Sequence, residues 1–373
     1  MFTFFSFMKK AITYLITILG LIITIHQGFG FSEPIADTIK AKNQVLVYPI
    51  VFFLPETGWG FGGAGLYNFR FSDESADSNP SQIQFTLSVT QKKQFLFTIP
   101  FEIYRNQNLW KFKGELSYYR YLYNFYGIGI DSKFEDRETF NADYPRFRVD
   151  VLRWYNKMFL GLRLRYDNVH LFGKKENGLL EKSILKGTDG GTSLGVGFVA
   201  QLDTRNYIYN PTQGFFGEAE IFVNDQFIFS DFKYIRYSLD LSKYTKIGEK
   251  KTLALQIFTA AITGNPFFYD LLYFGSPKLM RGFQDRRFKD KNIFVFQSEY
   301  RFPLYKRLEG GTFLSTGSVA DQYKELFSNE YKIVYGAGLR FTLNQKDRIR
   351  LRVDYGRTAK EGGNFYITIN DAF

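Results

Sequence analysis

The sequence has no cysteine and only two histidines in 373 residues. Without cysteine the chain cannot form disulfides, thiolate metal sites or a cysteine nucleophile. The histidines are His26 and His170, and His26 lies in a segment that we expect to be cleaved. A hydrolase would therefore need serine or aspartate to act with His170 alone. We predict no catalytic residue, no bound metal and no cofactor, and keep a hydrolase built on His170 as a separate alternative.

Long hydrophobic runs are also missing, because only residues 11–25 approach an uninterrupted apolar stretch. This excludes a bundle of membrane-spanning helices. Lys9 and Lys10 precede the stretch and Gly28 and Gly30 follow it, which is the pattern of a secretory signal peptide. We predict that residues 1–30 are cleaved, with Met8 as an alternative start and an uncleaved anchor as the alternative fate.

Helical periodicity is the third absence, since no segment after residue 44 repeats apolar residues at helical spacing. The dominant period is two. In residues 348–355, one face carries Ile349, Leu351, Val353 and Tyr355, and the other carries Arg348, Arg350, Arg352 and Asp354. Strands that are charged on one face and apolar on the other, with no helices to cover them, are typical of a transmembrane barrel with a wet lumen. A secreted β-sandwich is the alternative.

The alternation predicts an all-β fold, a transmembrane antiparallel β-barrel of about 16 strands over residues 44–373. The expected strands are 44–53, 58–71, 81–91, 93–104, 109–121, 146–156, 157–170, 190–203, 213–225, 230–245, 250–264, 291–304, 310–320, 331–344, 347–357 and 363–373. The longest interruptions, 122–145, 171–189 and 265–290, are predicted to be outer loops, because periplasmic turns are short. Beside the first loop, an aromatic girdle at the membrane surface is expected from Tyr121, Tyr123, Phe125 and Tyr126.

The formal net charge of +11 would suit nucleic acid, anionic lipid or an anion-lined cavity. The polar faces of the expected strands carry Lys111, Lys113, Arg146, Arg148, Arg163, Arg165, Lys332, Arg340, Arg348, Arg350 and Arg352. Inside a barrel these residues would either favour anions or form ladders with luminal carboxylates. Because they are spread over many strands, we expect no nucleic-acid partner.

Two polar segments stand out. One is the turn Asp203-Thr204-Arg205-Asn206 followed by Asn210-Pro211-Thr212-Gln213-Gly214, and the other is Arg281, Gly282 and Phe283 in the interruption 265–290. With the terminal Phe373, they resemble the bacterial surface antigen family of outer-membrane barrels, the BamA/TamA type. In that family the Arg-Gly-Phe loop is the sixth extracellular loop. It folds back into the lumen, where the arginine meets acidic residues on strands twelve and thirteen.

The resemblance implies partners for Arg281. The family's strand-twelve acid, shortly before Phe-Pro, matches Glu299, and alternation places Glu299 on the luminal face, so we predict it as the luminal partner of Arg281. The strand-thirteen pattern matches Phe313 and Gly317. A serine stands where the second acid is expected, and Asp321 lies further along. We therefore expect the loop to be held by fewer contacts than in the family.

The expected terminal strand has an apolar face interrupted by Asp371 and formed by Phe365, Ile367, Ile369 and Phe373. Such a strand with a final aromatic resembles the outer-membrane assembly signal. Gly363 follows Gly362 at its start, so the strand could bend or pair poorly at the seam with the first strand.

The segment 31–43 is too short for a polypeptide-transport-associated domain of ordinary size. We therefore predict a barrel-only member with a signal peptide (1–30), a short periplasmic segment (31–43) and a barrel (44–373). The resemblance implies the outer membrane of a Gram-negative bacterium. Its implied partners are outer-membrane lipid, nascent outer-membrane proteins and lipoproteins.

The resemblance also implies a function without catalytic chemistry, which is assistance in the insertion or translocation of outer-membrane proteins or lipids, with the seam as the working part. The alternative is a passive pore that is plugged by the loop around Arg281 and has a slight anion preference.

Overall fold

The structure is a computed structural model that describes residues 43–75, 77–207, 210–344, 349–369 and 371–373. The predicted signal peptide 1–30 lies outside the described residues, as does the predicted periplasmic segment apart from its last residue. In the described part of the chain, no helix is both long and apolar enough to cross a membrane.

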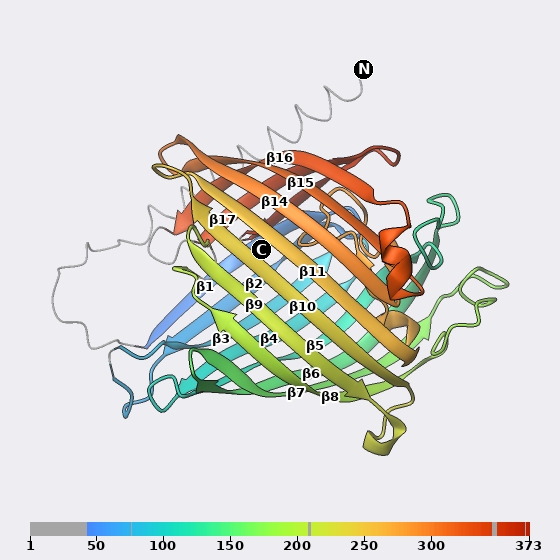
Figure 1. Cartoon of the computed structure of the whole chain (residues 1–373), viewed down its shortest axis with the longest axis horizontal. Coiled ribbons are helices and arrows are strands. Elements are labelled where there is room, and N and C mark those ends of the chain that lie inside the picture. The colour runs from blue at the N-terminus through green and yellow to red at the C-terminus, as the bar shows by residue number, and fades with distance from the viewer. Residues whose placement is uncertain (1–42, 76, 208–209, 345–348, 370) are drawn as a thin grey trace. The chain divides into compact units, whose positions relative to one another are not determined.

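Sixteen antiparallel strands close into one barrel, which confirms the predicted fold class (Figure 1). In chain order the barrel strands are β1 (Gln44–Leu54), β2 (Gly58–Phe69), β3 (Ser81–Thr90), β4 (Phe95–Arg105), β5 (Trp110–Phe125), β6 (Glu138–Tyr155), β7 (Met158–Phe172), β8 (Gly190–Asp203), β9 (Gly214–Asn224), β10 (Lys233–Lys246), β11 (Thr252–Asn265), β14 (Asn292–Tyr305), β15 (Leu308–Ala320), β16 (Lys332–Asn344), β17 (Ile349–Thr358) and β18 (Gly363–Ile369). Each strand pairs with the next barrel strand along the chain, and β18 returns to β1.

Shorter elements lie in the loops. Two three-residue strands, β12 (Leu272–Phe274) and β13 (Phe288–Asp290), form a separate small sheet within the segment between β11 and β14. Three 3-10 helices are η1 (Gln226–Ile228), η2 (Phe268–Asp270) and η3 (Tyr323–Phe327).

The barrel has a long-loop end and a short-turn end (Figure 1). The long-loop end carries the connections 126–137, 173–189, 225–232, 266–291 and 321–331. Most turns at the short-turn end are tight, such as 106–109, 156–157, 247–251 and 306–307. Barrels of the outer membrane place their short turns in the periplasm.

Alternation along the strands separates an exposed apolar face from a buried, largely polar face. Leu162, Phe198 and Ile221 are exposed on the outward face, whereas Arg163 and Glu220 on the same or a neighbouring strand are buried. The outward face therefore suits lipid, and the polar side chains line the interior.

Many interior basic side chains are paired with carboxylates. Arg163 lies 2.6 Å from Asp150 and 2.9 Å from Glu218, and it also pairs with Glu220. Other pairs are Lys111 with Glu102, Arg146 and Arg148 with Asp167, and Arg165 with Glu220. These contacts match the carboxylate-ladder alternative for these basic residues.

Strands β5 and β6 are longer than predicted, so the first long loop is 126–137 and not 122–145. The predicted aromatic girdle beside it is wrong, because Tyr121, Tyr123, Phe125 and Tyr126 are buried. Tyr121, Tyr123 and Phe125 belong to one cluster with Phe268 and Tyr269 of the segment between β11 and β14, and Tyr126 stacks on Phe134. The strands continue past the predicted boundary because their inward-facing aromatic side chains find partners there.

The terminal strand is shorter than predicted, because β18 ends at Ile369 and residues 371–373 lie outside it. The Asp371 carboxylate lies 3.0 Å from the Arg301 guanidinium, and its side chain is only 2% exposed. The prediction that Phe373 continues the strand's apolar face is therefore wrong. The Asp371 side chain is instead part of a buried ion pair with Arg301 of β14.

Candidate functional site

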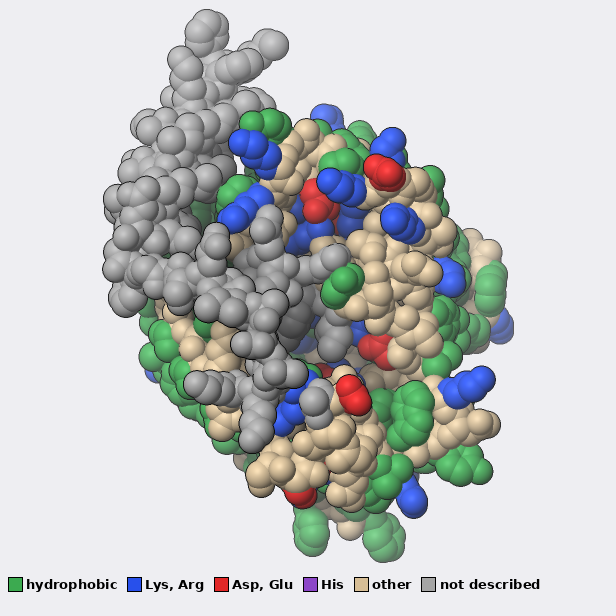
Figure 2. Space-filling view, turned by 90° about the vertical axis from the view of Figure 1, so that its left-hand side faces the viewer, with side chains coloured by type: hydrophobic (Ala, Val, Ile, Leu, Met, Phe, Trp, Pro, Cys, Tyr) green, Lys and Arg blue, Asp and Glu red, His purple; other side chains and the backbone are tan. Residues whose placement is uncertain are grey.

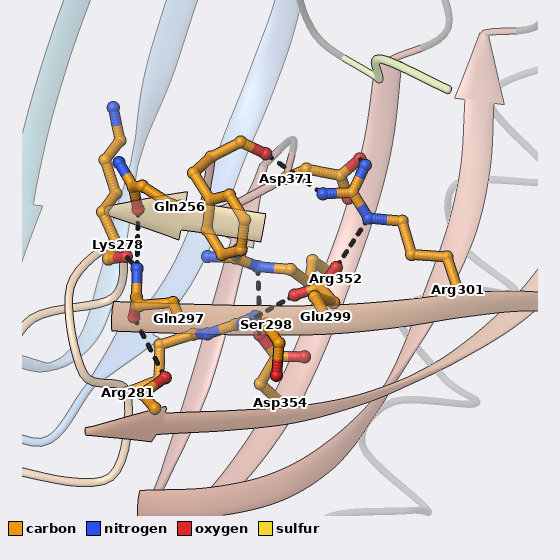
Figure 3. Close-up of polar contacts among 12 residues, drawn as sticks. Gln256, Lys278, Arg281, Gln297, Ser298, Glu299, Arg301, Arg352, Asp354 and Asp371 are labelled. Carbon is orange, nitrogen blue, oxygen red and sulfur yellow. Dashed lines mark hydrogen bonds and ion pairs between the residues drawn. The ribbon is translucent and has the colours of Figure 1, made fainter. Parts of the chain in front are cut away.

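The candidate site is the segment 277–283 and the strands that hold it. Arg281 is fully buried, and its guanidinium donates to Glu299 of β14 at 2.5 Å and to Asp354 of β17 at 2.7 Å (Figure 3). The guanidinium carbon also lies 4.0 Å from the ring centroid of Phe313 on β15. One arginine thus contacts three strands of the buried polar face. We call Arg281, Glu299 and Asp354 the lock.

Two further arginines form ion pairs with the carboxylates of the lock. Arg340 of β16 lies 3.1 Å from Glu299 and 3.0 Å from Asp354, and Arg352 of β17 lies 3.2 Å from Asp354. All of these side chains are at most 2% exposed. Buried carboxylates surrounded by several guanidiniums are stable as ions only while their partners stay in place.

The charge of Arg281 depends on its partners. Burial by itself would lower the pKa of Arg281, but the charges of Glu299 and Asp354 outweigh burial and hold the pKa above its ordinary value. Lys278, which lies on the same segment, has a lowered pKa because it is buried beside other cations, including Arg352. The lock therefore fixes a charged arginine in a water-poor interior.

The backbone of the segment is held as tightly as its arginine. The Gln297 side chain on β14 accepts a hydrogen bond from the Met280 amide at 2.8 Å and donates one to the Lys278 carbonyl at 3.0 Å. Arg352 donates to the Pro277 carbonyl at 2.9 Å. The path also requires a glycine on β17, since a Cβ on Gly356 would lie 2.2 Å from the Arg281 carbonyl oxygen.

The terminal strand also binds the segment. Asn364 of β18 donates to the Gly282 carbonyl at 2.6 Å. The Tyr366 hydroxyl accepts a hydrogen bond from the Gly282 amide at 3.0 Å and donates one to the Phe283 carbonyl at 2.5 Å. The predicted loop motif Arg281, Gly282 and Phe283 thus contacts β14, β17 and β18.

The expectation of fewer contacts is wrong, because Asp354 supplies a second carboxylate. Ser315, at the position expected for that acid, donates to Gln297 at 3.2 Å. Asp321 lies 2.7 Å from Lys291 instead. The strand-thirteen residues lie beside the segment, since Phe313 stacks on Arg281 and a Cβ on Gly317 would meet the Met280 sulfur at 2.6 Å.

The predicted motif turn between β8 and β9 reaches the same cluster through Arg301. Asp203 and Arg205 pair at 2.6 Å, and Gly214 adopts a φ of +118°, which favours glycine. Asn210 and Pro211 are buried, and the Pro211 carbonyl accepts from Arg301 at 3.1 Å.

Arg301 is a second hub. Besides Pro211, it binds Glu299 at 2.7 Å, Asp371 at 3.0 Å and the Phe373 carbonyl at 3.0 Å. It therefore joins the lock, the motif turn and the segment after β18, and Figure 3 shows it beside Glu299 and Asp371.

The residues missed by sequence reasoning are Asp354, Arg301, Arg340 and Tyr366. Asp354 and Arg340 stood on predicted polar faces, but alternation within a strand does not reveal contacts between distant strands. Tyr366 carried a weaker signal, as the polar-tipped residue opposite the apolar row of the terminal strand.

The seam between β1 and β18 contrasts with every other junction. In the described residues these strands are in register at one pair, Phe53 with Ile367. By comparison, β1 and β2 pair along all of Gln44–Leu54, and β17 and β18 pair from Leu351 to Arg357. The predicted seam residues Gly363, Phe365 and Ile369 pair with β17 and make no registered pair with β1.

His170, on which the hydrolase alternative depends, has an exposed side chain on β7. Its Nδ1 lies 3.3 Å from Asp143 Oδ1. Within the described ranges, no group of three or more His, Cys, Asp or Glu side chains is placed to hold a metal ion.

Solved structures share this fold. BamA from Haemophilus ducreyi lacking POTRA domains 1–3 matches with a TM-score of 0.59 and 13% identity over 88% of this chain and 70% of that chain. CdiB from Escherichia coli matches with a TM-score of 0.62 and 11% identity over 89% and 67%. CdiB from Acinetobacter baumannii matches with a TM-score of 0.56 and 13% identity over 88% and 59%. At these identities the likeness concerns the fold.

No curated protein sequence matches the chain. The family model of the Omp85 superfamily domain matches residues 67–373, which is most of the chain and nearly the whole barrel. The chain therefore belongs to the Omp85 superfamily.

Proposed function

We propose that this chain is an outer-membrane barrel of a Gram-negative bacterium that assists the insertion or translocation of outer-membrane proteins or lipids without catalytic chemistry. The observation that supports it is the seam, where β1 and β18 share one registered pair in the described residues. Backbone groups left without a strand partner form a template for another strand. A weak seam therefore suits a protein that opens sideways to its substrate.

The proposal extends to processing and partners. Residues 1–30 are a cleaved signal peptide, residues 31–43 are a short periplasmic segment, and nascent outer-membrane proteins or lipoproteins are the partners. The segment around Arg281 is a loop folded into the lumen, where it closes the barrel. The contacts of Arg281 with β14 and β17, which two other strands separate, support this placement.

Locking the seam tests the lateral route. Phe53 and Ile367 are Cα partners, and such pairs lie about 4.5–5.5 Å apart, which is within reach of a disulfide. Because the chain has no cysteine, a Phe53→Cys/Ile367→Cys variant contains only the designed pair. The matched control is Val151→Cys/Leu162→Cys, which links registered residues of β6 and β7.

The readout is quantitative outer-membrane proteomics of cells that carry only the locked variant. We expect the oxidised seam variant to fold and yet to reproduce the losses seen on deletion, with recovery after reduction and no loss in the control. Full function of the oxidised seam variant refutes a lateral route. Loss of many barrels on deletion identifies a general assembly factor, and loss of one or two identifies a dedicated partner.

The plugged pore is the second candidate, and the contacts of segment 277–283 favour it. A planar-bilayer recording of a variant lacking residues 276–286 distinguishes the two. Steady conductance that rises on deletion, together with an unchanged proteome, supports the pore. The pairing of interior arginines with carboxylates lowers the anion preference expected of such a pore.

A further inference from the structure

Two neighbouring hairpin turns at the short-turn end carry a dense group of basic residues. The turn 247–251 joins β10 to β11, the turn 306–307 joins β14 to β15, and β11 pairs with β14. We call the group on these turns and strand ends the basic rim, which consists of Lys243, Lys246, Lys250, Lys251, Lys306 and Arg307. All six are exposed, and the single acidic residue of these two stretches is Glu249. Figure 2 views this end of the barrel and shows Lys and Arg side chains around its edge.

The basic rim is unlike the basic residues of the interior. None of its six members forms an ion pair with a carboxylate among the residues that the structure describes, whereas the interior arginines are paired. The Lys306 ammonium lies 5.1 Å from the ring centroid of Tyr305. Six exposed cations that form no ion pair among the described residues, beside the single carboxylate of Glu249, make a surface that attracts anions.

The position of the rim relative to the apolar band indicates the kind of anion. On β10 the outward row runs through Tyr237, Leu239 and Leu241, and the next outward residue is Lys243. On β14 the row ends at Leu304, and Tyr305, which is 67% exposed, and Lys306 follow. Tyrosine and basic residues at the edge of an apolar band lie at the level of lipid headgroups.

We propose that the basic rim binds acidic phospholipid headgroups of the membrane leaflet at the short-turn end. The occupant is lipid because Lys243 and Lys306 follow the outward rows of apolar side chains on β10 and β14, and a phospholipid contacts apolar and basic side chains at once. Leu239, which is 36% exposed, and Leu304 contact the acyl chains, while the lysines and Arg307 bind the phosphates. An acidic protein would meet only the turn tips. This inference rests on the membrane location in the proposed function and is independent of the role in insertion or translocation, which the lipid measurement does not test.

Native mass spectrometry of the full-length protein in mixed micelles tests the proposal. The lipids are phosphatidylglycerol, which is acidic, and phosphatidylcholine, which has no net charge. The test variant is Lys243→Gln/Lys251→Gln/Lys306→Gln/Arg307→Gln. The matched control replaces four exposed lysines of the long-loop end, Lys133→Gln/Lys175→Gln/Lys182→Gln/Lys324→Gln.

We expect the parent protein to retain phosphatidylglycerol in preference to phosphatidylcholine, with retention that falls as salt rises. The rim variant should lose about ten-fold or more of this retention, and the control should change by less than about two-fold. Equal retention of both lipids, a preference that is insensitive to salt, or equal losses in the two variants would overturn the proposal. So would a rim variant that keeps its lipid but no longer binds polyglutamate, because that outcome identifies an acidic protein partner. The salt titration uses the parent protein alone, so it decides the question even if a variant does not fold.

Discussion

The terminal strand β18 is held differently on its inner face and along the edge that faces β1. On the inner face, Asn364 and Tyr366 bind the backbone of Gly282 and Phe283, which the lock fixes through Arg281. Along the edge that faces β1, the described residues of β18 form one registered pair with β1. The comparison predicts that separating the seam costs less free energy than withdrawing the segment 277–283, so that a seam that opens would leave the lock closed.

Removing the central carboxylate of the lock should have the largest effect. Glu299→Ala leaves Arg281, Arg301 and Arg340 without the acid that they share, and it should cost ~3–5 kcal/mol because buried charges become unpaired. Limited proteolysis around Arg281 should show a freed segment. Unchanged protease protection would contradict the central role of Glu299. The control is Glu330→Ala, which removes the ion pairs of the exposed Glu330 carboxylate with Lys332 and Lys360 and should cost less than ~1 kcal/mol.

Neutralising the second carboxylate should have a smaller effect. Asp354→Asn keeps the size and one acceptor oxygen but removes the charge that faces Arg281, Arg340 and Arg352, so we expect a loss of ~2–3 kcal/mol in thermal or urea unfolding. Electrophoresis of unheated samples monitors the folded barrel. A variant as stable as the parent would show that Glu299 holds the segment by itself.

Crowding the segment's path should cost less again. In Gly356→Ala the new Cβ would meet the Arg281 carbonyl, so the segment must shift, at a cost of ~1–3 kcal/mol. Gly65→Ala is the matched control, because a Cβ there has no neighbour within 4 Å. Equal stabilities of the two variants would mean that the segment does not need this close approach.

The smallest expected effect concerns the link between the two regions. Asn364→Ala removes the bond from β18 to the Gly282 carbonyl and should cost ~0.5–1.5 kcal/mol. Hydrogen exchange should rise in β18 and stay constant in β14. Faster hydrogen exchange in β14 would show that the lock and the terminal strand open together, and it would contradict the prediction that the lock stays closed when the seam opens.

Most of the fold could be predicted because alternate residues of a barrel strand face lipid and lumen, so the sequence alternates between apolar and polar residues. The period of two gave sixteen strands near their observed positions, and it placed Glu299 on the interior face. It failed at 138–145, where inward aromatic side chains extend β6 beyond the expected boundary, and at residues 371–373, which lie outside the strand and include Asp371, an ion-pair partner of Arg301.

The candidate site was less accessible to sequence reasoning. Arg281 and Glu299 could be found because each belongs to a recognisable sequence motif. Asp354 was one of several charged residues on its strand, and no motif distinguished it. Its contact with Arg281 depends on how a long segment crosses β15 and β16, and strand periodicity contains no information about that path. Ser315 marked the departure from the family pattern, but the residue that replaces the missing acid lies two strands away.

The contacts of Tyr366 also bear on the order in which the chain folds. Since β18 is the last strand and binds the segment 277–283 directly, its docking onto Gly282 and Phe283 can guide it to its position. The internal segment would then act as a template for the final step of barrel formation, and joining β18 to β1 would be the last event of folding.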